Sequence, residues 1–427
     1  MSVLSKITGK EKIPKDLLLL LLIGGLYYLS IALSNTFVNV YIWKQSKSLI
    51  DIGLYNLMIV IFQPLTFIIA GRWAKKIDRV IVMRLGVISL AVFFITVLLL
   101  GNHAKQFLLL LGALIGIGFG FYWLAFNVLI FEITEPKTRD FFNGFLGLLS
   151  SLAGMAGPLT AGWIISSMVD EIGYKVIFAI SLFLFTCAVA VSFFIKRRHA
   201  KGEFQIKRIL KERQNNDNWK YILNAHFFQG CREGTFSFII VIWVFITTKS
   251  EMSLGAYSFV ESGVMLISYY LVSRLIKPDK RIQAILCSGL VLYAAIFLLI
   301  FHLNYKNLMI YAVLIALAYP ALVVPYGSLT FDVIGKGWRS ASMRIEYVVV
   351  REIFYNSGRI TSILLFLAAV LLFKDEQGLR CLLLIIGLGH PMVYFWIRHI
   401  NLTNDSSKQL TADSPKKIRD GESGSTV

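Results

Sequence analysis

Charged residues, cysteines and recognisable catalytic motifs are scarce in this chain. Only 16% of its 427 residues are Asp, Glu, Lys or Arg, against roughly 25% in an average soluble domain. The four cysteines lie in separate apolar runs without metal-ligand spacing, so neither a zinc site nor a disulfide framework is predicted. No Walker loop or nucleophile elbow is present. We therefore expect neither an enzyme nor a cofactor or metal site.

Long apolar runs dominate instead. The chain is 56% hydrophobic with a mean hydropathy of +0.68, and a helix needs about 20 apolar residues to cross a bilayer core. The first run is too long for a signal-peptide core, so a permanent helix is expected, and the runs lack the alternation of a β-barrel. Twelve spans are predicted, at 17–43, 52–71, 80–100, 107–131, 142–167, 174–195, 221–247, 252–272, 282–302, 308–331, 345–373 and 380–397.

The formal charge of +18 raises the question of a nucleic-acid partner, but the distribution of the charge answers it. If the N-terminus is cytoplasmic, 31 of the 43 Lys and Arg fall in cytoplasmic stretches and 8 in outer loops or at the span ends beside them. This bias predicts a multi-pass protein with both termini in the cytoplasm and no nucleic-acid partner. Four arginines remain within spans: Arg84, Arg232, Arg351 and Arg359.

The two halves of the chain resemble each other. The segment IGLYNL at 52–57 is echoed by LGAYSF at 254–259, and GRWAKKIDRV at 71–80 by SRLIKPDKRI at 273–282, each 202 residues later. Six spans per half predict parallel repeats. The expected domains are an N-terminal bundle (1–195), a basic cytoplasmic central loop (196–220), a C-terminal bundle (221–400) and a disordered tail (401–427).

These features resemble the major facilitator superfamily of secondary transporters. In the signature that follows the second helix of that family, Gly71, Ala74, Lys76 and Arg79 fit, whereas Lys75 and Asp78 stand at the usual Asp and second Gly positions. The resemblance implies an all-α membrane protein with twelve transmembrane helices in two parallel six-helix bundles. The segments YWLAFNVLIFEITEP and HFFQGCREGTF also resemble an uncharacterised branch of such transporters from Gram-positive bacteria, which implies a bacterial plasma membrane.

The fifth span carries AGMAGPLTAG at 153–162. It is similar to the antiporter motif of the family, with Gly157, Pro158 and Gly162 intact, although the arginine motif of the fourth helix is absent. The same residues also fit a small-residue packing face with a proline kink, and the two interpretations are compatible.

Ionised residues also occur at mid-depth. Glu233 lies about 20 Å into the layer if the seventh helix begins at Lys220. Two polar stripes are predicted: one of His226, Gln229 and Glu233, with Arg232 next to Glu233, and one of Glu352, Asn356 and Arg359, with Arg351 next to Glu352. A charge at this depth costs about 3 kcal/mol. These side chains either form packing ion pairs, such as Arg232 with Glu352 or Glu233 with Arg359, or line the transport pathway.

By resemblance, the first, fourth, seventh and tenth helices line the substrate cavity. Its candidates are Asn35, Asn39, Trp123, Asn127 and Tyr319, together with Arg232 and Glu233. The alternative for each polar residue is a hydrogen bond between helices. Glu132 and Asp332 are expected to pair with basic residues of adjacent loops as a cytoplasmic gate. The full set of gating candidates is Gly71, Asp78, Arg79, Glu132, Asp332, Gly157, Pro158 and Gly162.

The resulting hypothesis is a monomeric plasma-membrane transporter that moves a small or amphipathic solute by alternating access. Proton coupling is expected, with antiport or efflux favoured over symport, so the partners are a small-molecule or amphiphilic substrate, protons and the lipid bilayer. The competing hypothesis is a transporter-like sensor or scaffold that no longer transports, for which the departures at Lys75 and Asp78 leave room.

Overall fold

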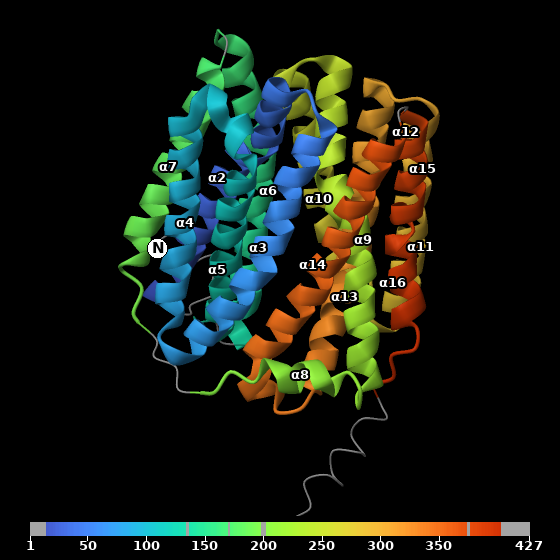
Figure 1. Ribbon diagram of the computed structural model, residues 1–427. Helices are drawn as coiled ribbons and strands as arrows, with labels where there is room; N and C mark the ends of the chain where they lie inside the picture. The colour runs from blue at the N-terminus through green and yellow to red at the C-terminus, as the bar shows by residue number, and fades with distance from the viewer. Residues whose placement is uncertain (1–13, 134–135, 170, 198–201, 374–375, 403–427) are drawn as a thin grey trace, which may run out of the picture.

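Two groups of long helices stand side by side in the computed structural model, which describes residues 14–133, 136–169, 171–197, 202–373 and 376–402 (Figure 1). The first group, coloured blue to green, is the N-terminal bundle. Its helices are α2 (Lys15–Ser46), α3 (Leu49–Lys76), α4 (Arg79–Leu100), α5 (Leu108–Ile133), α6 (Pro136–Ser167) and α7 (Ile172–Ser192). A short 3-10 helix, η1 (Gly101–Phe107), joins α4 to α5.

The second group, yellow to red, is the C-terminal bundle, in which two of the crossings are broken. Its helices are α9 (Asp217–Thr248), α10 (Glu251–Leu275), α11 (Arg281–Ala294) with α12 (Ile296–Phe301), α13 (Tyr305–Gly335), α14 (Ser340–Leu372), and α15 (Glu376–Gly387) with α16 (Gly389–Ile397); η2 (Pro278–Lys280) precedes α11. The predicted architecture of twelve crossings in two bundles is confirmed for the described residues. The predicted tail falls outside them from residue 403 onward.

Membrane-spanning character accounts for these crossings. Ten segments of the described chain are long and apolar enough to cross a membrane, and one of them, Arg79–Ile130, contains α4 and most of α5. The remaining crossing is α10, whose 25 residues include Glu261 and several Ser and Tyr residues that lower its hydropathy. The least apolar crossing therefore carries an acid within its length.

Small residues let helices approach closely inside the N-terminal bundle. A Cβ atom on Gly112 would meet the carbonyl oxygen of Tyr55, and one on Gly116 would meet that of Ile59. The backbones of α5 and α3 are therefore in contact, as expected where glycines recur four residues apart on a membrane helix.

Contacts between the bundles run along two helix pairs. Helices α3 and α14 touch along their whole length, from Gly53 against Leu367 to Gly71 against Val349. Helices α6 and α10 touch as well, where a Cβ on Gly154 would meet Ser262 and one on Gly162 would meet the backbone of Glu251. The bundles are therefore joined on two sides.

The central segment packs against the bundles. Helix α8 (Ile206–Glu212) lies at the lower end of the C-terminal bundle in Figure 1. We call this end of the molecule the linker end and the opposite one the distal end. The Glu212 carboxylate accepts hydrogen bonds from the Trp338 backbone N–H (3.1 Å) and the Tyr347 hydroxyl, and Trp219 Nε1 donates to the Ile209 carbonyl (3.2 Å). The segment predicted as a loop therefore holds a short helix attached to the C-terminal bundle.

Candidate functional site

One carboxylate ties four helices of the C-terminal bundle together. Glu233, on α9, accepts hydrogen bonds from Gln229 Nε2 (3.0 Å), from the Tyr319 hydroxyl (3.0 Å) and from the Tyr355 hydroxyl. His390 Nε2 lies 3.7 Å from its Oε1 atom. These partners come from α9, α13, α14 and α16. A buried carboxylate with several donors is stabilised in its charged form, so the charge of Glu233 organises the centre of the bundle.

The polar stripe on α9 continues toward the linker end. His226 Nδ1 lies 3.1 Å from Gln229 Oε1, and its Nε2 lies 3.4 Å from the Thr330 hydroxyl on α13. The stripe is therefore a continuous chain of hydrogen bonds from Thr330 to Glu233. A proton or a polar group entering at one end of this chain would alter bonds at the other.

Arg232, next to Glu233, is held differently. Its Nη2 atom donates to the Tyr311 hydroxyl (2.7 Å), and its guanidinium lies 3.4 Å from the centroid of the Phe236 ring. The side chain is buried, and its Nε atom has no hydrogen-bond partner. Among the described residues, Arg232 pairs with no carboxylate.

A cavity of about 260 Å³ opens beside Arg232 and Glu233, between α9, α10 and α13. Glu261 of α10 lines it and has no hydrogen bond or ion pair with any described residue. Tyr257 and Tyr311 also line it, so aromatic walls surround the charges. Sequence reasoning missed Glu261, although a single acid within the apolar run at 252–272 was a visible signal.

The stripe on α14 reaches the N-terminal bundle. Arg359 Nη1 donates to Gln63 Oε1 on α3 (3.3 Å) and to Asn356 Oδ1 (3.2 Å). The Arg359 guanidinium also lies 5.6 Å from the centroid of the Tyr355 ring. Since Tyr355 bonds to Glu233, the acid is linked through two side chains to a contact between the bundles.

The packing ion pairs considered from the sequence do not form among the described residues. Glu352 pairs with its neighbour Arg351 (2.7 Å) rather than with Arg232. Glu233 is held by tyrosines rather than by Arg359. Tyrosine hydroxyls therefore bind Glu233, where an arginine was considered from the sequence.

The candidates in the N-terminal bundle divide between packing and cavity. Asn39 accepts a hydrogen bond from Asn56 Nδ2 of α3 (2.8 Å), so it joins two helices. Asn35 is partly exposed and bonds with none of the described groups. Trp123 packs edge-on against Tyr27, with ring centroids 5.3 Å apart. Asn127 lines a pocket.

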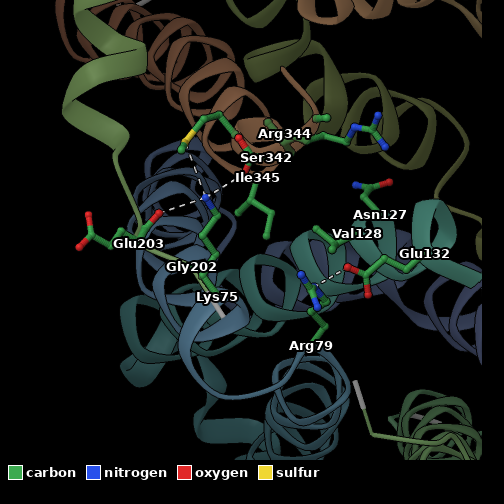
Figure 2. Close-up of a pocket in the computed structure, with 13 residues that line it drawn as sticks. Lys75, Arg79, Asn127, Val128, Glu132, Gly202, Glu203, Ser342, Arg344 and Ile345 are labelled. Carbon is green, nitrogen blue, oxygen red and sulfur yellow. Dashed lines mark hydrogen bonds and ion pairs between the residues drawn. The ribbon is translucent and has the colours of Figure 1, made fainter. Parts of the chain in front are cut away.

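That pocket, of about 340 Å³, lies at the linker end between the bundles (Figure 2). In Figure 2, Asn127 and Arg344 face the same space from opposite bundles, and the ammonium of Lys75 lies at its edge. Lys75 Nζ lies 2.5 Å from Glu346 Oε1 of α14 and donates to the Glu203 carbonyl (3.1 Å). Lys75 therefore joins α3, α14 and the central segment at one point.

The two gating acids occupy equivalent places. Arg79 Nε lies 2.6 Å from Glu132 Oε1 in the N-terminal bundle, and Arg281 Nη1 lies 3.0 Å from Asp332 Oδ2 in the C-terminal bundle. Both pairs lie within a bundle, so neither crosses the gap. Asp78 is buried and caps α4 by accepting from the Val80 N–H (2.7 Å).

The gating candidates with small side chains lie at helix contacts. A Cβ on Gly71 would meet Phe204 of the central segment and Val349 of α14. A Cβ on Gly157 would meet the backbone of α2, one on Gly162 would meet α10, and the Pro158 carbonyl lies against Gly255 of α10. Gly71, Pro158 and Gly162 therefore affect how closely the bundles approach, and Gly157 affects how closely α6 packs on α2.

Two cross-bundle acids were also missed. Glu346 pairs with Lys75 at the linker end, and Glu251 pairs with Lys44 (3.0 Å) at the distal end, where the Tyr174 hydroxyl also donates to it (2.8 Å). Both acids fall at the ends of spans, where a charge alone is unremarkable. Among the described residues, no group of three or more His, Cys, Asp or Glu side chains could hold a metal ion.

Comparison with known proteins agrees with this architecture. The family model described as Major Facilitator Superfamily matches residues 20–350. The uncharacterized protein YqgE of Bacillus subtilis (strain 168) is 54% identical over 419 residues, which cover 98% of this chain and 97% of that protein. An uncharacterized protein from the sodM 3′ region of Geobacillus stearothermophilus is 58% identical over 206 residues, covering 48% of this chain and 96% of that protein.

A solved structure shares the fold. The crystal structure of the human organic anion transporter MFSD10 (TETRAN) covers 90% of this chain, and this chain covers 100% of it, with a TM-score of 0.66. The sequences are 14% identical, so the likeness concerns the arrangement of the helices.

Proposed function

Because the chain belongs to the major facilitator superfamily, and is therefore a multi-pass secondary transporter rather than an enzyme, we propose that it moves a small or amphipathic solute by alternating access. The proton gradient drives the movement, and exchange is favoured over symport. The protein works as a monomer in the plasma membrane, with the linker end and both termini in the cytoplasm.

The observation that carries the coupling is the bonding of Glu233. Its charged carboxylate accepts bonds from Gln229, Tyr319 and Tyr355. A protonated carboxyl is a weaker acceptor and must itself place a hydrogen, so protonation loosens the hold of α9 on α13 and α14. A proton would thus change the packing of the bundle.

The route from Glu233 to the bundle interface is short. Tyr355 bonds to Glu233 and packs near Arg359, and Arg359 donates to Gln63 across the interface. When protonation frees Tyr355, Arg359 loses its fixed neighbour and the contact with α3 weakens. Proton binding and bundle movement are coupled by this chain of contacts.

Exchange is supported by the fifth span. Gly157, Pro158 and Gly162 of the antiporter-like motif lie where α6 meets α2 and α10, so the motif sits on surfaces that must slide or rock during alternating access. Its small residues let those surfaces pass at short distance.

The test is a flux assay in sealed vesicles with an imposed pH gradient and a panel of amphiphilic, sugar and anionic solutes. Wild-type protein is expected to move at least one solute against its concentration gradient. In Glu233→Gln, the accumulation driven by the pH gradient is expected to fall tenfold or more, which corresponds to about 1.4 kcal/mol of coupling free energy. Asp217→Asn, an exposed acid on the same helix, is the matched control. Normal gradient-driven flux in Glu233→Gln would remove Glu233 as the coupling acid.

A further inference from the structure

The cavity beside Arg232 contains two opposite charges that do not neutralise each other. Arg232 is buried and lies over the Phe236 ring; among the described residues it bonds only to the Tyr311 hydroxyl, and its Nε atom finds no partner. Glu261, on the facing helix α10, lines the same cavity and pairs with none of the described residues. An arginine and a glutamate that line one cavity in a membrane protein would ordinarily pair with each other.

Helix packing accounts for Glu233 and for the bond of Arg232 to Tyr311, but it gives no reason for the charge of Glu261. Glu233, on the same wall, is held by donors from several helices, whereas Glu261 holds nothing in place. Residues that fix helix packing are bonded to the helices they fix. The Glu261 carboxylate instead lines the cavity without a partner among the described residues, so a ligand is the natural source of its partner.

The shape and size of the cavity limit that ligand. Its volume is about 260 Å³, slightly below the range of about 300–1,000 Å³ of drug-sized sites. Between the two charges the walls are apolar and aromatic, with Ile240, Tyr257 and Ile315 among them. The occupant must be small, with an apolar middle and charged ends.

We propose that this cavity binds a small zwitterionic solute, whose anionic group is held by Arg232 and whose cationic group is held by Glu261. This inference rests on the proposed transport function, because it names the class of solute. A simple anion would leave Glu261 unpaired, and a simple amine would leave Arg232 unpaired, so only a molecule with both charges satisfies the site. The aromatic rings of Tyr257 and Tyr311 add favourable contact with a cationic group.

Matched probes test this proposal. Purified full-length protein is titrated with ω-amino carboxylates of two to six carbons, and with the carboxylates and amines of the same chain lengths, while thermal stability reports binding. At least one amino carboxylate is expected to stabilise the wild type at concentrations about ten- to a hundredfold lower than its two singly charged relatives, the effect of one charged hydrogen bond.

Reciprocal variants supply the critical result. Glu261→Gln should weaken binding of the amino carboxylate by a similar factor and leave binding of the singly charged carboxylate unchanged. Arg232→Gln should also weaken binding of the amino carboxylate and leave binding of the singly charged amine unchanged. Glu261→Asp, which retains the charge, should keep the preference and shows that the position tolerates change. Asp217→Asn and Arg274→Gln, which neutralise exposed charges at the linker ends of α9 and α10, are the controls.

The proposal is overturned if the wild type binds no member of the panel, binds singly charged probes equally well, or keeps its preference in both neutral variants. Binding is measured without a pH gradient, so the transport function and the zwitterion site are tested independently of each other. A protein that binds the amino carboxylate but shows no gradient-driven flux refutes the transport function alone. Proton-driven flux that is indifferent to Arg232 and Glu261 refutes the present inference alone.

Discussion

Each end of the interface between the bundles is held by a lysine of the N-terminal bundle and a glutamate of the C-terminal bundle. Lys75 pairs with Glu346 at the linker end (2.5 Å), and Lys44 pairs with Glu251 at the distal end (3.0 Å). Alternating access requires one end to open while the other closes. We therefore predict that Glu346→Gln and Glu251→Gln shift the conformational equilibrium in opposite directions.

The burial of the two pairs sets the size of each shift. The side chains of Lys75 and Glu346 are 8% and 0% exposed, so loss of the acid leaves a lysine that regains hydration only when the linker end opens. Breaking such a buried pair costs about 3 kcal/mol, or roughly a hundredfold in the equilibrium. Lys44 and Glu251 are 35% and 11% exposed, and their pair contributes about 1 kcal/mol, or roughly fivefold.

Distances between spin labels measure the two openings directly. One pair of labels at Asn143 and Arg274 reports on the linker end, where α6 and α10 separate, and a second pair at Lys47 and Lys249 reports on the distal end. All four side chains are exposed, and the native cysteines are replaced beforehand. Pulsed dipolar spectroscopy then gives the fraction of each open state.

Glu346→Gln should lengthen the linker-end distance in nearly all molecules, and Glu251→Gln should raise the smaller distal-open population severalfold. Asp332→Asn breaks a pair of the same chemistry inside one bundle, and it should change neither distance. Movement of both glutamine variants in the same direction, or no movement in either, would refute the assignment of these pairs as opposing gates.

Two further predictions concern the C-terminal bundle. Gly358→Ala should lower the free energy of unfolding by about 1–3 kcal/mol in a thermal melt, because a Cβ there would overlap the backbone of Phe227. The control Gly144→Ala should be neutral, because no described atom lies within 4 Å of its Cβ position. Equal effects of the two changes would contradict this packing. Tyr355→Phe should uncouple solute flux from the pH gradient without loss of folding, because it removes one donor to Glu233 at a cost of about 1.5–3 kcal/mol, and unchanged coupling would exclude this route.

The architecture was accessible from the sequence because its causes are local. Apolar run lengths predict the crossings, and the offset of about 200 residues placed Glu132 and Asp332 at equivalent helix ends, where the structure sets Arg79 and Arg281 beside them. Spacing along α9 also predicted that His226, Gln229 and Glu233 share one face, and they are joined by hydrogen bonds. The orientation in the membrane stays a prediction.

The partners of the charges were not accessible, because they depend on helices far apart in the chain. Glu346 lies 271 residues from Lys75. A lysine at a position usually held by an acid indicated that an ion pair was lost there, not that an ion pair with the two charges exchanged takes its place. Of the tyrosines that hold Glu233, Tyr319 was expected in the substrate cavity without a link to Glu233, and Tyr355 looked like an ordinary span residue. Whether a charge such as that of Glu261 faces a neighbour or a cavity depends on rotations of α10 that apolar periodicity does not specify.

The two bundles contribute unequally to this chemistry. Several polar contacts of the N-terminal bundle, such as Asn39 with Asn56 and the Ser30 hydroxyl with the Ser181 carbonyl (2.9 Å), join neutral groups and fix helix packing. The charged residues that line the cavity, Arg232, Glu233 and Glu261, all belong to the C-terminal bundle. Since a solute or proton can shift an equilibrium only through groups whose bonding it changes, we expect the ligand to act on the C-terminal bundle, which contacts the N-terminal bundle through Arg359 and Gln63.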